Sequence, residues 1–111
     1  MVNAMHVLQQ QARRQQELVN ERRKRKLLPV ARALVDPFRS QEIVRVAMGQ
    51  VLLWRKNQLC SPDYIDAWEG LLKRPQEAAR VLQDSSPYAD QLRQNSPFVA
   101  VVRKMQGLNA A

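Results

Sequence analysis

The stretch SPDYIDAWEGLLKRP, residues 61 to 75, contains both a start and a stop signal for a helix. Ser61 can cap the first turn through its hydroxyl, and Pro62 suits the first helical position because its missing N–H would have no partner inside the helix. The apolar residues that follow are spaced one, three, three and one apart, which places them on one helical face. They are Tyr64, Ile65, Trp68, Leu71 and Leu72. The stretch therefore predicts an amphipathic helix, and Pro75 ends it.

Similar signals predict the other helices in the second half of the chain. Pro75 can itself open a short helix over residues 75–83, and the Ser-Pro pairs at residues 86–87 and 96–97 each predict another helix start. The helix after Ser86 is expected to run through Leu92. The last helix is expected to start at Pro97 and to be capped by Gly107.

The first half shows the same pattern. Ser40 predicts the N-cap of a helix from Gln41 to about Gln58, and the stretch LLPVARALVDPF predicts one short helix bounded by Pro29 and Pro37. No segment shows convincing strand alternation, and three glycines leave few positions for hairpin turns. We therefore expect an all-α fold, a small bundle of five or six mostly short helices.

The N-terminal residues differ from the rest. Between Gln9 and Lys26 nearly all side chains are polar. Most are Gln, Arg, Lys or Glu, which favour a helix but give it almost nothing to bury. We therefore predict a basic polar arm at residues 1–26, a helical domain at residues 27–106 and a flexible tail at residues 107–111. The predicted core of the domain consists of Leu34, Phe38, Ile43, Val44, Ala47, Val51, Leu52, Trp54, Ile65, Trp68, Leu71, Leu72, Leu82, Leu92 and Phe98.

Positive charge is concentrated in the first half. The net charge is +8, and it is about +5 in residues 1–28, +3 in residues 29–60 and zero in residues 61–111. Such an uneven field attracts anions to one side of a molecule. The run ERRKRK, residues 21–26, places five consecutive cations around a helix, so no face of that turn can lie in a dry core.

Nucleic acid is the anionic partner that this charge favours most. The candidate contact residues are Arg13, Arg14, Arg22, Arg23, Lys24, Arg25 and Lys26, with secondary contacts at Arg32, Arg39, Arg45, Arg55 and Lys56. If each of the five consecutive cations neutralises one phosphate, the logarithm of affinity falls with the logarithm of salt at a slope of about −4.5. No helix-turn-helix or aromatic single-strand motif is recognisable, so the expected binding is largely independent of base sequence.

Other interpretations of the basic run stay open. It can be solvated surface that maintains solubility, or it can dock on an acidic protein or a lipid surface. The alternative function is a protein-interaction adaptor, in which the arm binds an acidic protein or forms a homo-oligomer through Met5, Leu8 and Ala12.

The chain lacks the groups that catalysis usually requires. His6 and Cys60 are the single histidine and cysteine, too few for a zinc site or an intrachain disulfide, and they lie far apart in sequence. Asp63, Asp66 and Glu69 have no histidine beside them, and we interpret them as a solvated acidic face. We therefore expect no enzyme activity, no cofactor and no metal.

No apolar stretch is long enough to cross a membrane, and the N-terminus lacks the apolar region of a secretory signal. We expect a cytoplasmic protein without a membrane span.

Residues 59–98 contain DAWEGLL and DQLRQNSPF, followed by the apolar VAVV. This region resembles small prokaryotic regulatory proteins of the toxin–antitoxin kind. The resemblance implies a compact helical segment that binds a partner protein, and hence an antitoxin-like regulator.

Overall fold

The computed structural model describes the backbone of residues 4–110 and the side chains of residues 4–105. Within this range all regular structure is α-helical, which confirms the predicted all-α class. The helices are α1 (Ala4–Leu34), α2 (Ser40–Asn57), α3 (Pro62–Leu72), α4 (Pro75–Gln83), α5 (Pro87–Arg93) and α6 (Val99–Ala110).

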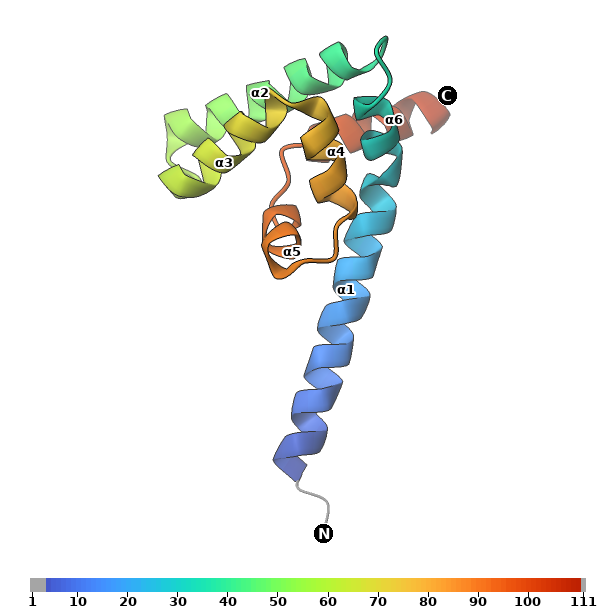
Figure 1. Cartoon of the computed structure of the whole chain (residues 1–111), viewed down its shortest axis with the longest axis vertical. Coiled ribbons are helices and arrows are strands. Elements are labelled where there is room, and N and C mark those ends of the chain that lie inside the picture. Colours follow the sequence, from blue (N-terminus) through green and yellow to red (C-terminus); the bar gives the residue numbers. More distant parts are fainter. Residues whose placement is uncertain (1–3, 111) are drawn as a thin grey trace.

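Five helices gather around the C-terminal half of α1, and its N-terminal half extends alone (Figure 1). Helices α2 and α3 lie side by side, α4 packs along α1, and α6 crosses between α1 and α2. The radius of gyration is 16.2 Å. A compact chain of this length has a radius of about 13 Å. The difference reflects the projecting helix, which makes the molecule 58 Å long but only 34 and 24 Å across.

The core lies where these helices converge on Trp68. Trp68 is fully buried, and its ring meets that of Phe98 edge to face with 5.5 Å between centroids. Most of the predicted core is buried as expected, including both tryptophans, while Val44 and Leu71 are half-buried. Cys60 is half-buried as well, as expected for a free cysteine.

Two predicted core residues are exposed. Phe38 is 93% exposed because it lies in the turn between α1 and α2, where its backbone N–H donates to Asp36 Oδ1 at 2.8 Å. Leu52 is 57% exposed because α2 buries the face that carries Ile43, Val51 and Trp54. Placing Phe38 and Leu52 in the core was therefore wrong.

Serine caps are confirmed at two of the predicted helix starts. The Ser61 hydroxyl accepts from the N–H of Tyr64 at 3.3 Å, and the Ser86 hydroxyl accepts from the N–H of Ala89 at 3.2 Å. Ser40 is not a cap, because α2 begins one residue earlier than predicted and Ser40 is its first helical residue. The Ser40 N–H instead donates to the carbonyl of Asp36 at 3.0 Å in the preceding turn.

The last helix also differs from its prediction. It begins at Val99 rather than Pro97, because the buried Ser96 hydroxyl accepts from the N–H of Phe98 at 3.0 Å and forms a turn first. The helix continues through Gly107, so the expected cap there was wrong. Of the predicted tail, residues 107–110 have helical backbone and residue 111 lies outside the described part of the chain.

Pro29 does not start a new helix, because α1 runs through it without interruption. Proline inside a helix costs about 3 kcal/mol, so something must offset that cost. The residues around it are buried on α1: Leu27, Val30, Ala31, Ala33 and Leu34. Their packing against the other helices supplies the offset, and the predicted arm continues into the domain as one uninterrupted helix.

Candidate functional site

The site is the outer face of α1. Leu27 and Leu34 are buried on the inner face, whereas residues 4–19 are exposed apart from the half-buried Val7. We call residues 6–19 the free segment, because it extends away from the other helices (Figure 1). The sequence indicated that the N-terminus could form a helix with nothing to bury, and over these residues it does.

Four arginines form a stripe along the outer face. They are spaced eight, three and seven residues apart, which keeps all four within about 80° of one another around a helix with 3.6 residues per turn. All four are exposed, and none forms an ion pair with a residue in the described range 4–105. The arginine stripe consists of Arg14, Arg22, Arg25 and Arg32. It covers about 27 Å of the helix.

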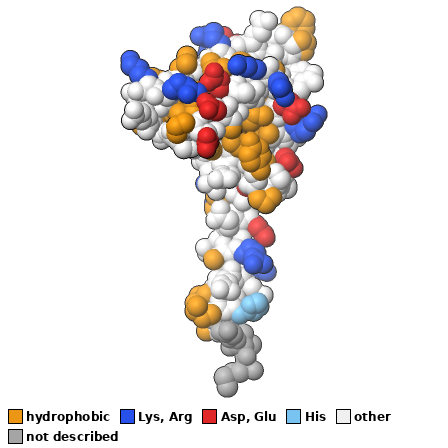
Figure 2. Space-filling view, turned by 60° about the vertical axis from the view of Figure 1, so that its left-hand side comes forward, with side chains coloured by type: hydrophobic (Ala, Val, Ile, Leu, Met, Phe, Trp, Pro, Cys, Tyr) orange, Lys and Arg blue, Asp and Glu red, His pale blue; other side chains and the backbone are white. Residues whose placement is uncertain are grey.

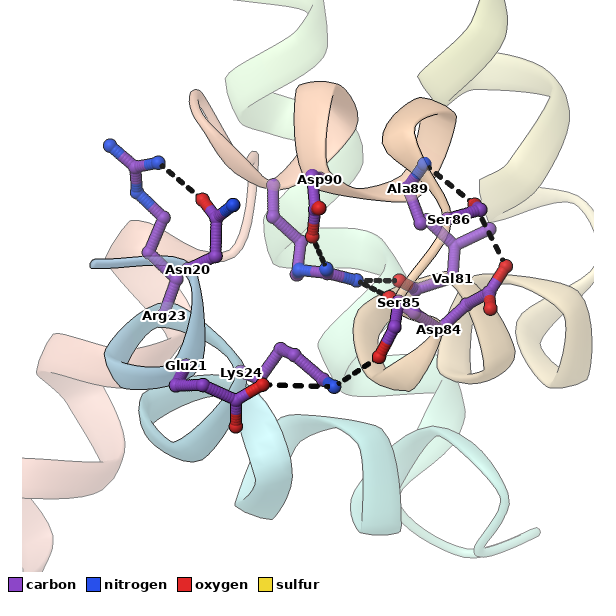
Figure 3. Close-up of polar contacts among 11 residues, drawn as sticks. Asn20, Glu21, Arg23, Lys24, Val81, Asp84, Ser85, Ser86, Ala89 and Asp90 are labelled. Carbon is purple, nitrogen blue, oxygen red and sulfur yellow. Dashed lines mark hydrogen bonds and ion pairs between the residues drawn. The ribbon is translucent and has the colours of Figure 1, made fainter. Parts of the chain in front are cut away.

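The five consecutive cations do not act as one cluster. Lys24 turns toward the fold, where its Nζ donates to the Ser85 hydroxyl at 2.7 Å and lies 3.5 Å from Glu21 Oε1 (Figure 3). Arg23 leaves the helix in another direction, is half-buried, and donates to Asn20 Oδ1 at 3.4 Å (Figure 3). None of the five cations is buried, in line with the expectation that no face of this turn lies in a dry core, but only Arg22, Arg25 and Lys26 are exposed.

A basic pocket lies beside the stripe, between α1, the turn that follows α5, and α6. It has a volume of about 280 Å³ and is lined in part by Arg23, Lys26, Leu27, Asn95, Val102 and Arg103. No lining residue is acidic. Arg13, in contrast, lies on the free segment away from both the stripe and the pocket, and it is exposed.

The secondary basic residues divide into paired and unpaired ones. Arg45 forms two hydrogen bonds to Glu42, at 3.0 and 2.6 Å, and Arg55 lies 2.9 Å from Asp66 and 2.7 Å from Glu69. These bonds raise the pKa of both arginines. On the folded part, basic and acidic side chains accordingly lie next to one another (Figure 2).

The remaining two, Arg39 and Lys56, are exposed on α2 or next to it and form no ion pair with a described residue. Arg39 borders an apolar groove together with Phe38 and Met105. Of the five secondary residues, only Arg32 belongs to the arginine stripe.

Glu42 links two helices through its basic partners. Hydrogen bonds from Arg45 and then from Lys104 of α6 lower the pKa of Glu42 from 4.5 to about 2. Lys104 Nζ lies 3.1 Å from Glu42 Oε1. Glu42 therefore binds both cations and offsets one of their two positive charges within the protein.

Arg93 is a buried basic residue whose charge is satisfied within the protein. It is 2% exposed, and its Nη1 donates to the carbonyls of Val81 at 2.6 Å and Asp84 at 2.5 Å. Its Nη2 pairs with Asp90. Nearby, the Ser86 hydroxyl donates to Asp84 at 2.9 Å (Figure 3). Arg93 therefore joins the end of α4 to α5.

Sequence reasoning missed two features of this site. The spacing of the arginines in the sequence already places them on one face, but the five consecutive cations are the more conspicuous feature of the same segment. Arg103 carried no local signal, because only the fold brings α6 beside α1.

Two negative observations concern the described residues. They contain no group of three His, Cys, Asp or Glu side chains arranged to hold a metal ion, and Asp66 and Glu69 bind Arg55 instead. None of the helices in this range is both long enough and apolar enough to span a membrane.

Comparison with known proteins adds no identity. The chain matches no protein-family model, no curated protein and no solved structure, so the resemblance of residues 59–98 to toxin–antitoxin regulators stays without support.

Proposed function

We propose that the chain is a cytoplasmic, non-enzymatic regulatory protein that binds nucleic acid through the arginine stripe of α1. The single observation that carries this proposal is the alignment of four exposed, unpaired arginines on one face of a helix whose opposite face anchors it to the fold. Unpaired charge aligned along one face of a continuous helix suits a linear polyanion better than it suits plain solubility.

The expected contacts are to phosphates. Guanidinium groups bind phosphate oxygens with two parallel hydrogen bonds, so each arginine can hold one phosphate firmly. Such contacts position a protein on the strand without reading its bases. Binding is therefore expected to depend strongly on salt and weakly on sequence.

Four phosphate contacts set the size of the salt effect. Each contact to duplex DNA contributes about −0.9 to the slope of log affinity against log salt, which gives about −3.6. Affinity should then fall about 150-fold between 50 and 200 mM salt. This estimate replaces the value of about −4.5 for five consecutive cations, because Arg23 and Lys24 interact with their own protein.

The experiment compares two double variants that remove the same net charge. Arg22→Gln/Arg25→Gln removes two stripe residues, and Arg45→Gln/Arg55→Gln removes two arginines already paired with acids. We expect the first to weaken binding to duplex DNA at 50 mM salt at least tenfold and the second to weaken it less than threefold. Equal effects would mean that net charge, and not the stripe, drives binding.

The competing function, a protein-interaction adaptor, has one observation in its favour. Leu8 and Val19 are 60% and 41% exposed, and with Ala12 they continue the inner face of α1 beyond the fold. A partner helix or a second copy of the chain could cover that face. Measuring the mass of the protein in solution tests whether it forms an oligomer. If the protein stays monomeric at high concentration and still binds DNA, the result supports nucleic-acid binding through the arginine stripe.

A further inference from the structure

The basic pocket beside the arginine stripe has an unbalanced charge. Arg23, Lys26 and Arg103 line it, and none of the three forms an ion pair with a residue in the described part of the chain. Arg93 also borders the pocket, but Asp90 balances its charge. Three cations from two helices thus converge on one hollow without a protein counter-charge.

The polar wall of this pocket is held in place from behind. Asn95 lies in the turn after α5, and its carbonyl oxygen is 2.7 Å from the Tyr64 hydroxyl, which is also 2.7 Å from the carbonyl of Leu92. The Asn95 side-chain amide lies 3.2 Å from Cys60 Sγ. The turn that forms this wall of the pocket is therefore fixed to α3.

The lining also has an apolar part. Leu27 and Val102 are buried core residues whose edges border the pocket, and Val99 beside them is 46% exposed. A pocket lined by both cations and aliphatic carbon matches a ligand that joins a phosphate to an uncharged, flat or aliphatic body. The volume of about 280 Å³ is at the small end for ligand pockets, so it suits one nucleotide unit rather than a length of strand.

We propose that this pocket binds the terminal phosphate monoester of a nucleotide, with Arg23, Lys26 and Arg103 around the phosphate and the nucleoside against Leu27, Val99 and Val102. A phosphate monoester carries about −1.5 to −2 charges near pH 7. An internal phosphodiester carries one charge, so three convergent cations favour the monoester. The inference goes beyond the proposed function, because a free nucleotide can enter this pocket whether or not the stripe holds a polymer.

The test measures binding of adenosine monophosphate and of adenosine by calorimetry. We expect the monophosphate to bind at least tenfold more tightly than the nucleoside, because charge-assisted hydrogen bonds to the phosphate dominate. Arg103→Gln should weaken monophosphate binding at least tenfold, and Arg103→Lys should restore part of it. Equal affinity for adenosine and its monophosphate overturns the proposal.

The matched control is the neighbouring residue on the same helix. Lys104→Gln removes the same charge one position away, from a side chain that binds Glu42 and does not line the pocket. The affinity of this variant for the monophosphate should stay within twofold of that of the unaltered protein. If Lys104→Gln and Arg103→Gln have the same effect, the phosphate responds only to overall charge and the pocket assignment is wrong.

A second pair of probes identifies the source of the phosphate. A single-stranded oligonucleotide with a terminal phosphate and one with a terminal hydroxyl differ only in the group at issue. If the terminal phosphate raises the affinity for the oligonucleotide and Arg103→Gln abolishes that increase, the ligand is a strand end. If a phosphate raises affinity only in the mononucleotide, the ligand is the free nucleotide. Either result supports a monoester site. Arg22→Gln/Arg25→Gln should leave the affinity for the monophosphate within twofold of that of the unaltered protein. If the unaltered protein binds the monophosphate but no polymer, the stripe is refuted and the pocket is not.

Discussion

The two ends of α1 show how differently one helix can be stabilised. Residues 27–34 bury five side chains against the other helices, whereas the free segment buries almost nothing and depends on helix propensity alone. Helix formation therefore does not show that a segment has a packing partner. The same helix is a core element at one end and a displayed surface at the other, and the arginine stripe spans both.

The largest expected difference between the two regions comes from deleting the same side chain in each. Leu82→Ala empties a fully buried site on α4 and should lower the free energy of unfolding by about 4 kcal/mol. Leu18→Ala makes the identical change where the side chain is 54% exposed, and it should alter stability by less than about 0.5 kcal/mol. Urea unfolding monitored by tryptophan fluorescence measures both. Comparable losses would show that the free segment packs on the domain.

A second pair contrasts two arginines. Arg93→Met leaves the carbonyls of Val81 and Asp84 and the Asp90 carboxylate without their partner, so we expect a loss of about 3 kcal/mol in unfolding free energy. Arg22→Met removes an exposed, unpaired arginine and should cost less than about 0.5 kcal/mol. The same unfolding assay applies. A stable Arg93→Met protein would mean that water satisfies these groups once the guanidinium is gone.

A glycine in the free segment tests its independence. Gln16→Gly should weaken the local helix by about 1 kcal/mol, because glycine loses more backbone entropy and has no side chain to support the turn. Circular dichroism should therefore show less helix, while the unfolding midpoint of the domain stays unchanged. A shift of that midpoint would indicate coupling between the free segment and the core.

The smallest expected effect concerns pH. Because the pKa of Glu42 is lowered to about 2 in the folded protein, its contribution to stability is complete above the ordinary value of 4.5 and is lost as the pH falls toward 2. Nuclear magnetic resonance titration of the Glu42 carboxylate should give a midpoint near 2. Lys104→Gln removes one of the two hydrogen bonds that lower this pKa, so it should raise the midpoint. An unchanged midpoint would mean that Arg45 alone lowers the pKa of Glu42.

The successes and failures of sequence reasoning have local causes. The all-α class and the caps at Ser61 and Ser86 follow from signals within a few residues, and they were predictable. The failures at Leu52 and Pro29 depend on tertiary packing, whereas Phe38 is exposed because of the turn that begins at Asp36. Which face of α2 turns inward, and whether burial offsets a proline, cannot be deduced from one segment.

The candidate site was predicted in composition but not in arrangement. The basic character of α1 was evident, yet the consecutive run suggested five equivalent cations. Only the fold shows that Lys24 meets Ser85, sixty-one residues away, and that Arg103 joins Arg23 and Lys26. Long-range pairings of this kind depend on how helices cross, which the charge pattern of a single helix does not encode.

The salt dependence of duplex DNA binding tests the role of the stripe most directly. For the unaltered protein we expect a slope of log affinity against log salt of about −3.6, falling to about −1.8 in Arg22→Gln/Arg25→Gln and staying near −3.6 in Arg45→Gln/Arg55→Gln. Identical slopes in the two double variants, or no measurable binding at low salt, would contradict the assignment of the outer face of α1 to phosphates.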